Sequence, residues 1–320
     1  MAANPNWNDL VVTTLRHRRK TTADNVTEHN ALLTRIKETG GYDPAPGGRT
    51  LVEEIDFDAN EAGGWYAGYE PVALTPHQPL TAAEFDWKNN RRVVMASGDE
   101  LLKNEGPDAI LKMLNARIKN AVRSLTNDIG AGVYAIGTES GGKTMGGLRF
   151  LVADSPSTGS PGGHDRSTEI WWRNQSDDDE ITSATTAIGL MQSMWLSLVR
   201  GSDKPDLIVA DTVTYTAFWS ALTDIQRITE AKKGVSGYRS IAFAGPNGEA
   251  PVVFDDQCPA NHMYFLNTKY LKYRPHKNRN FHTDEQIRSM DQDAVLVPIY
   301  WMGNMTCSNA SLQGVIFDGD

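Results

Sequence analysis

The stretch PDAILKMLNARIKNAVRSLTNDIGAGVYAIGTESGGKT, residues 107–144, holds the clearest helical pattern of the chain and, directly after it, a glycine-rich motif. Apolar residues recur at three- and four-residue steps from Ile110 to Ile129, which predicts an amphipathic helix with one apolar stripe. Pro107 suits a first helical position, and two glycines near the other end favour a stop. We therefore expect a spine helix over residues 107–130, roughly 34 Å long as far as Ile129.

The motif GTESGGKT, residues 137–144, matches the nucleotide-binding pattern G-x-x-x-x-G-K-[ST] at every required position. In a nucleotide-binding loop this pattern follows a buried strand and opens a helix, so that backbone N–H groups face the phosphates. Here a helix precedes the motif, residues 145–147 disfavour a helix after it, and residues 148–152 predict a strand. We expect the glycines to make a sharp turn, and a P-loop protein using Gly137–Thr144 is the less favoured alternative.

Length and composition exclude several classes of protein. The chain has 320 residues and a net charge of −9, which argues against a dedicated nucleic-acid binder. No apolar run approaches the roughly 18 residues of a membrane-spanning helix, and the polar N-terminus has no signal-peptide core. Cys258 and Cys307 are too few for a disulfide framework, so we expect two unpaired thiols, with one bridge between them as the alternative.

Known catalytic and metal-binding patterns are missing from the sequence. None of the seven histidines belongs to an H-E-x-x-H pattern, and there is no C-x-x-C, G-x-S-x-G or dinucleotide-binding fingerprint. The acidic run at residues 177–180 is more typical of a solvated turn than of a cation site. A Ser/His/Asp set assembled from distant loops would leave no such pattern. We predict no catalytic, cofactor-binding or metal-binding residues, and no enzyme activity.

Residues 1–48 are interpreted as an arm rather than a domain. Helical patterns at residues 7–15 and 25–37 are followed by a Gly/Pro-rich break at residues 40–48. The arm carries a basic cluster that is either a solvated face or a contact with an acidic partner surface or packaged nucleic acid. The cluster consists of Arg16, His17, Arg18, Arg19 and Lys20.

Residues 49–98 predict a long two-stranded ribbon. Apolar and acidic residues alternate over residues 55–58 on the first arm, and apolar and charged residues alternate over residues 85–88 on the second. The first arm is acidic and the second ends in a basic stretch at residues 88–92, so we expect opposite charges on the paired strands to hold the register. An isolated ribbon is marginal in water, so this one needs a surface outside its own chain.

The remaining chain has an α+β pattern with long excursions rather than a repeating βαβ pattern. Residues 153–180 are rich in loop-forming residues. Helices are then predicted at residues 181–199 and 212–228, and strands at residues 207–211, 240–243, 251–254, 263–267, 294–302 and 312–317.

Five local stretches accompany this order of elements. They are Arg91–Gly98, Gly147–Asp154, Asp165–Thr168, Trp171–Asn174 and Met263–Leu271. Together and in this order, with the arm, the ribbon, the spine helix and the body, they make a chain that resembles the major capsid protein of tailed bacteriophages over nearly its whole length.

The resemblance implies an α+β fold with an N-terminal arm, an extended β-ribbon loop, a long spine helix, and peripheral and axial domains. Some relatives join a ribbon lysine covalently to an asparagine of another subunit, but no matching motif surrounds Lys88, so we do not expect that chemistry here. On this chain the implied parts are the arm at 1–48, the extended loop at 49–98, the peripheral domain at 99–180 and 270–302 with the spine helix at 107–130, and the axial domain at 181–269 and 303–320.

The resemblance also implies a structural subunit that assembles into hexamers and pentamers of an icosahedral phage head enclosing double-stranded DNA. The implied partners are other copies, a separate scaffolding protein, a portal protein, a decoration protein, and packaged DNA contacted without sequence specificity; no membrane is involved. The subunit would be assembled in the host bacterial cytoplasm and end in the virion capsid. A non-viral encapsulating compartment of the same fold is a further alternative.

We expect contacts between subunits on the arm and the ribbon, because both reach beyond the body of the chain and supply large interfaces from a thin subunit. The candidate contact residues are Arg16, Arg18, Arg19 and Lys20 on the arm, and Glu53, Glu54, Asp56, Phe57, Trp65, Tyr66, Tyr69, Phe85, Trp87, Lys88, Arg91 and Arg92 on the ribbon.

Overall fold

The computed structural model describes residues 30–58, 65, 67–69, 79–98, 107–179, 181, 183–222, 241–284, 287–288 and 293–319. Within them, the helices are α2 (Ala31–Glu38), α4 (Pro107–Val133), α5 (Glu139–Gly142), α6 (Leu148–Leu151), α7 (Ala184–Leu198) and α8 (Thr212–Ala221), with 3₁₀ turns η1 (Pro161–Gly163), η2 (Ile170–Trp172), η4 (Thr268–Tyr270) and η5 (Ala310–Leu312). The strands are β1 (Leu51–Asp56), β2 (Leu80–Phe85), β3 (Lys88–Ser97), β4 (Gln175–Asp177), β5 (Leu207–Ala210), β6 (Ile241–Gly245), β7 (Gly248–Phe254), β8 (His262–Leu266), β9 (Leu271–Pro275), β10 (His282–Thr283), β11 (Ile287–Arg288), β12 (Ala294–Cys307) and β13 (Gly314–Phe317).

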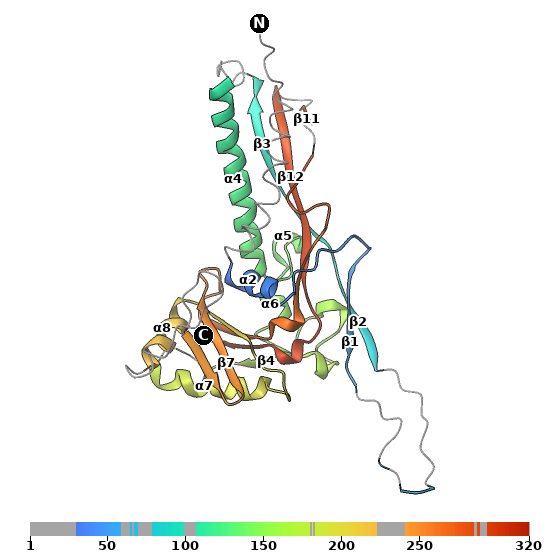
Figure 1. Cartoon of the computed structure of the whole chain (residues 1–320), viewed down its shortest axis with the longest axis vertical. Coiled ribbons are helices and arrows are strands. Elements are labelled where there is room, and N and C mark those ends of the chain that lie inside the picture. The colour runs from blue at the N-terminus through green and yellow to red at the C-terminus, as the bar shows by residue number, and fades with distance from the viewer. Residues whose placement is uncertain are drawn as a thin grey trace.

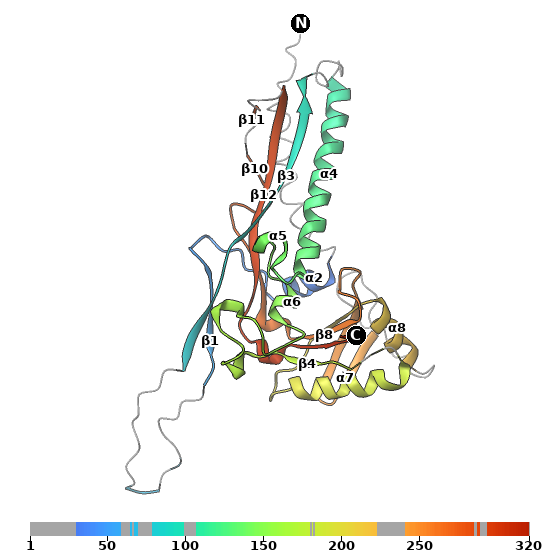
Figure 2. The same cartoon turned by 180° about the vertical axis from the view of Figure 1, so that it is seen from behind.

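The molecule is elongated, with three parts that differ in shape. Figures 1 and 2 show α4 running alongside β3 and β12 at one end, and a body that contains α7 and α8 in the middle. The ribbon of β1 and β2 leaves the body on the side away from α4. A subunit of this shape exposes much of its surface to whatever lies beside it.

Strand β12 is the centre of a five-stranded sheet, called here the spine sheet, which also contains β3, β9, β10 and β11. It pairs antiparallel with β3 from Ala294 opposite Ser97 to Gly303 opposite Lys88, and then with β9 as far as Cys307. The short strands β10 and β11 pair with its other edge. The strand predicted at residues 294–302 is therefore confirmed, and it continues to Cys307.

Helix α4 lies on β3, as its apolar stripe predicts. Ile118, Leu125 and Ile129 of this stripe are buried. The predicted helix at residues 107–130 is confirmed except at its end, because α4 continues through two glycines to Val133. Val133 is fully buried, and burying a valine offsets the cost of about 1 kcal/mol that each helical glycine carries.

The second sheet, called the body sheet, has six strands in the order β4-β13-β8-β5-β7-β6. Helices α7 and α8 cover one face, where Trp195, Phe218 and Phe243 form the centre of a hydrophobic cluster. The other face, with Val209 and Tyr264, belongs to the larger core of the molecule. Because both faces are covered, the central strands are continuous apolar runs, and this is why the sequence predicts them well.

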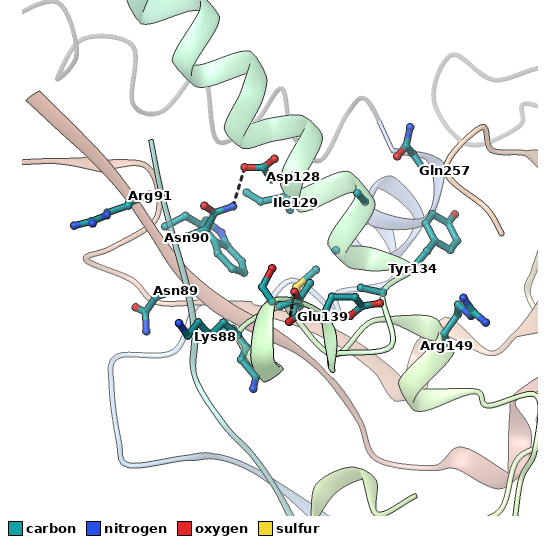
Figure 3. Close-up of a pocket in the computed structure, with 18 of the residues that line it drawn as sticks. Lys88, Asn89, Asn90, Arg91, Asp128, Ile129, Tyr134, Glu139, Arg149 and Gln257 are labelled. Atoms are coloured by element: carbon teal, nitrogen blue, oxygen red, sulfur yellow. Dashed lines mark hydrogen bonds between the residues drawn. The ribbon is translucent and has the colours of Figure 1, made fainter. Parts of the chain in front are cut away.

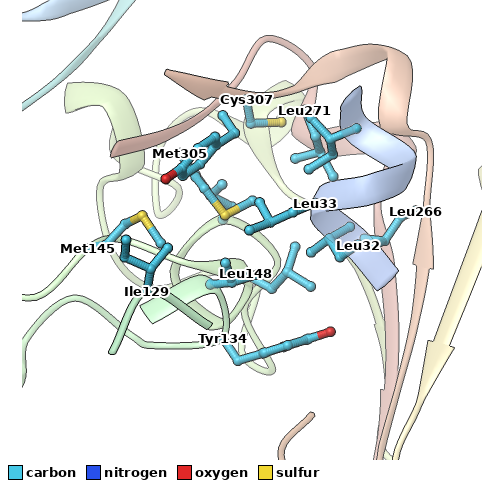
Figure 4. Packing of buried hydrophobic residues seen from close by; sticks show 14 of the residues in the cluster. Leu32, Leu33, Ile129, Tyr134, Met145, Leu148, Leu266, Leu271, Met305 and Cys307 are labelled. Atoms are coloured by element: carbon cyan, nitrogen blue, oxygen red, sulfur yellow. The ribbon is translucent and has the colours of Figure 1, made fainter. Parts of the chain in front are cut away.

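The larger core joins α2, the end of α4, α6 and the spine sheet. Figure 4 shows Leu32 and Leu33 of α2 packing with Leu148 of α6 and Met305 of β12. The side chain of Asn30 caps α2 by accepting a hydrogen bond from the Leu33 N–H at 3.1 Å. The chain is thus fixed to the body from residue 30 onward, and the earlier part of the predicted arm lies outside the described residues.

One local prediction is wrong in type. Residues 148–152 were expected to form a strand, but residues 148–151 form the short helix α6. Leu148 and Leu151 are three residues apart, about one helical turn, and both are fully buried, while Arg149 between them is half-exposed. An apolar run of this length fits a strand and a buried helical turn equally well.

The ribbon is confirmed at its base but is shorter than predicted. Strands β1 and β2 pair antiparallel from Leu51 opposite Phe85 to Asp56 opposite Leu80. The chain then leaves the ribbon after Phe85, and the basic stretch at residues 88–92 belongs to β3 in the spine sheet. The predicted pairing of charges across the ribbon is therefore wrong, because residues 88–97 pair with β12 and pack on α4 instead of pairing with β1.

Candidate inter-subunit surface

The inner face of the ribbon base is fixed by a buried carboxylate, Glu53. Lys272 Nζ lies 2.7 Å from its Oε2, and both Arg274 Nη1, at 3.0 Å, and the Thr306 hydroxyl, at 2.9 Å, donate to its Oε1. These partners come from β9 and β12, 219 to 253 residues further along the chain. Glu53 was expected at a subunit contact, but it is 4% exposed and ties the ribbon to its own spine sheet.

Both arms of the ribbon also contact the loop that carries η1 and η2. Phe57 stacks on Trp171 with ring centroids 4.9 Å apart. His164 places its Nε2 3.1 Å from the carbonyl oxygen of Ala82 and its Nδ1 2.7 Å from the Glu169 carboxylate. The base of the ribbon is therefore held in one direction relative to the body.

The outer face of the ribbon is acidic and exposed. Val52, Glu54 and Asp56 alternate with the buried residues of β1. Leu80 and Glu84 of β2 lie on the same face, opposite Asp56 and Val52. Leu80 is 63% exposed and Val52 is 47% exposed. This outer face, made of three carboxylates and two apolar side chains, suits a partner surface that is basic and partly apolar.

The described part of the ribbon tip presents aromatic side chains to solvent. Trp65 and Tyr69 are fully exposed. Tyr66 and residues 59–64 and 70–78 lie outside the described residues. Large aromatic groups are enriched in the cores of protein interfaces, where they contribute much of the binding energy. Trp65 and Tyr69 are therefore the candidate anchors of this surface.

The other candidates divide between interior and surface. Phe85 is buried and Trp87 is half-buried, so both lie mainly within their own subunit. Arg91 is exposed, whereas Arg92 forms a two-bond ion pair with Asp128 of α4 at 2.7 and 2.9 Å. The basic residues of the arm, Arg16, Arg18, Arg19 and Lys20, lie outside the described residues.

The motif GTESGGKT borders a cavity of about 790 Å³ between β3, the end of α4 and α5 (Figure 3). Ser140 and Gly141 have φ values of 54° and 70°, so the motif forms a left-handed turn. The long helix precedes this turn, and the next helix, α6, has four residues. A phosphate-binding loop instead follows a buried strand and opens a longer helix, so this geometry does not fit one, and the glycines act as the sequence predicts, by turning the chain.

The cavity, called here the basic cavity, carries more positive than negative groups. Its two carboxylates are already engaged: Asp128 by Arg92, and Glu139 by the backbone N–H of Ile136 at 3.1 Å. Partial burial works against ionisation of Glu139, but hydrogen bonds from backbone N–H groups outweigh it and lower the pKa of this carboxyl. The cations that line the cavity are Lys88, Arg91, Arg92, Lys143 and Arg149.

The described part of the chain holds no group of three or more His, Cys, Asp or Glu side chains placed to bind a metal ion. Cys258 and Cys307 are unpaired and buried, as predicted. Burial raises the pKa of both thiols, to about 12 for Cys307, which is the opposite of what a cysteine nucleophile needs. Among the described helices, none has the length and apolar character to cross a membrane.

The fold is similar to those of several solved shell structures. A chain of the cyanophage A-1(L) capsid matches with a TM-score of 0.64 at 15% identity, over 90% of this chain and 93% of that one. The satellite phage P4 procapsid that includes the size determination protein Sid matches with a TM-score of 0.50 at 12% identity, over 93% and 98%. A virus-like particle from Pyrococcus furiosus matches with a TM-score of 0.51 at 9% identity, over 94% and 98%. At these identities the likeness shows the fold alone.

The family of the chain is shown by its sequence. No curated protein matches it. The family model described as SU10 major capsid protein, however, matches residues 100–315, which is more than half of the chain. The resemblance to tailed-phage capsid proteins is thereby confirmed, and the chain is a structural subunit of a shell rather than an enzyme. It belongs to the SU10 major capsid protein family.

Proposed function

We propose that the chain assembles into the hexamers and pentamers of an icosahedral phage head that encloses double-stranded DNA. The observation that carries this proposal is the ribbon. Its base is fixed to the subunit by Glu53 and Trp171, while its outer face and its tip expose acidic and aromatic side chains. A shell is stabilised by many modest contacts repeated by symmetry, and a rigid projection of this kind supplies one of them in every copy.

The two sheets support a division into two domains. We assign the spine sheet with α4 to the peripheral domain and the body sheet with α7 and α8 to the axial domain, which points into the centre of each capsomer. Two features refine the boundaries expected from the sequence. Strand β4, at residues 175–177, pairs with β13 and so belongs to the axial domain, and β12 runs without a break past residue 302.

Further partners follow from this function. A separate scaffolding protein would guide assembly in the host bacterial cytoplasm; the inclusion of the Sid protein in the P4 procapsid supports a partner of this kind. A portal protein and a decoration protein complete the virion. The basic cluster at residues 16–20 would touch packaged DNA without sequence specificity, because phosphate contacts carry no sequence information.

A non-viral compartment is the second candidate, since the fold is shared with the virus-like particle from Pyrococcus furiosus. The family match supports the phage head over this candidate. The P-loop alternative loses its support, because the turn at Gly137–Thr144 has the wrong order of elements for a phosphate site.

Removal of the ribbon tip tests the proposed function. The Phe57 N–H donates to the Pro79 carbonyl at 3.1 Å, so an Asn-Gly turn in place of residues 58–78 closes the ribbon as a short hairpin and keeps the contact between Phe57 and Trp171. We expect the unmodified chain to form rings or particles of megadalton size in sedimentation and electron microscopy, and the shortened chain to remain a monomer with a similar melting temperature. A full-length chain that stays monomeric at high concentration, with and without its scaffold, contradicts the proposal.

A further inference from the structure

The basic cavity has two cations with weak partners in their own subunit. Lys143 is exposed at the glycine turn. Arg149 makes a long ion pair with Asp154, at 3.7 Å, and its buried Nε has no hydrogen-bond partner among the described residues. By contrast, Lys88 donates to the Gly142 carbonyl at 2.7 Å. Among the described residues, neither carboxylate of the cavity forms an ion pair with Lys143 or Arg149, so both add to its positive charge, as do Lys88 and the exposed Arg91.

The outer face of the ribbon has the opposite character. Its three carboxylates, Glu54, Asp56 and Glu84, lie on one side of the two-stranded ribbon, with Val52 and Leu80 among them. Within one chain this face cannot reach the basic cavity, because the ribbon base is fixed and leads away from α4 and α5 (Figures 1 and 2). The two complementary surfaces can meet only between copies.

We propose that the outer face of the ribbon of one copy docks against Lys143 and Arg149 at the basic cavity of an adjoining copy. This inference rests on the proposed self-assembly and names the surface that receives the ribbon. Opposite charges across an interface fix its register and suppress wrong partners, which a subunit needs when it must repeat the same contact in every copy.

A second copy fits the cavity better than nucleic acid does. The cavity is concave and bounded by β3, α4 and α5, whereas a duplex is bound by cations spread along a face. The chain as a whole has 40 acidic and 31 basic residues, so carboxylates are the anions that every neighbouring copy supplies. The Gly142 carbonyl, which accepts from Lys88 at this turn, also disfavours a phosphate there.

A charge exchange within one chain tests the contact. The first variant, Lys143→Glu with Arg149→Glu, reverses the cavity; the second, Glu54→Lys with Asp56→Lys, reverses the ribbon; the third combines all four. We expect each double variant to need at least a tenfold higher subunit concentration for half-assembly, and the combined variant to assemble as the unmodified chain does. Light scattering and electron microscopy measure assembly, and melting curves of the dilute subunits check folding. If Arg149→Glu unfolds the subunit, the pair Lys143→Glu and Asp56→Lys carries the same test.

The control variant, Lys119→Glu with Arg123→Glu, changes the net charge equally but lies on α4 outside the cavity lining. We expect it to assemble normally. Normal assembly of the cavity variant, failure of the combined variant to recover, or an equal loss in the control each overturns the inference. Shells of the cavity variant that form normally but lose bound DNA would overturn it in favour of a nucleic-acid site. Failure of the unmodified chain to assemble would contradict the proposed function instead, so the two are distinguishable.

Discussion

Replacing Glu53 with glutamine probes the buried cluster that orients the ribbon. Glu53→Gln removes the charge that balances Lys272 and Arg274 while keeping the size of the side chain. Removing one partner of a buried ion pair costs about 3–5 kcal/mol. We expect the low end, about 3 kcal/mol, because the Lys272 side chain is 36% exposed and Arg274 keeps a second partner, Asp43, at 3.0 Å.

The assay is the melting temperature of dilute, unassembled subunits. The unfolding entropy is about 2.1 cal/mol/K per residue, which gives roughly 0.7 kcal/mol/K for 320 residues. A loss of about 3 kcal/mol in the free energy of unfolding therefore lowers the melting temperature by about 4–5 °C. Glu54→Gln, one residue away on the exposed face, is the matched control and should shift it by less than about 1 °C. Equal shifts for the two variants, or a shift below about 1 °C for Glu53→Gln, would refute the account of the ribbon base.

Three further predictions concern the subunit itself. Gly130→Ala has no atom within 4 Å of the added Cβ and should stabilise α4 by about 0.5–1 kcal/mol in urea unfolding. Gly147→Ala instead places its Cβ 2.2 Å from the Val133 carbonyl oxygen and should destabilise the subunit by more than about 2 kcal/mol. Similar effects of the two substitutions would contradict the packing of this turn. Burial raises the pKa of Asp255, so the protonated carboxyl stabilises the folded subunit fully below the pKa of the unfolded chain, about 4. This stabilisation is lost as the pH rises through the raised pKa of the folded state. Asp255→Asn should therefore flatten the fall in melting temperature over this pH range, and an unchanged slope would contradict the prediction. Because burial raises the pKa of Cys307 to about 12, a thiol reagent at pH 8 should label it only after denaturant is added, and rapid labelling of the native subunit would show that the core opens.

The sequence predicts the elements whose neighbours are close in the chain or whose burial is uniform. The apolar stripe of residues 107–130 and the buried run Leu207–Ala210 are read from local pattern alone, and both are found. Residues 88–97 also alternate as a strand should, but alternation does not reveal which strand they pair with, and their partner lies some two hundred residues away in β12. The type of α6 was missed because its run is too short to show a period.

The candidate surface was less predictable than the fold. In the sequence, Glu53 looks like any solvent-facing acid on a ribbon. It is buried because Lys272, Arg274 and Thr306, which are distant in the sequence, contact its carboxylate. The basic cavity is lined by residues from four separate segments of the chain, so no local sequence pattern predicts it. The one local signal, the glycine-rich motif, matches a nucleotide-binding pattern, but its flanking residues predict a turn, and it forms the turn that presents Lys143.

The unbroken course of β12 has a mechanical consequence. Within the spine sheet, it pairs with β3 from Ala294 to Gly303 and with β9 from Gly303 to Cys307, so a single strand runs through both sets of hydrogen bonds. A pull along this strand loads all of these hydrogen bonds together in shear, whereas a pull across it would open them one at a time. Tension within the wall of a shell would therefore be carried from one end of the subunit to the other by a single covalent backbone, with the ladder resisting slip on both sides.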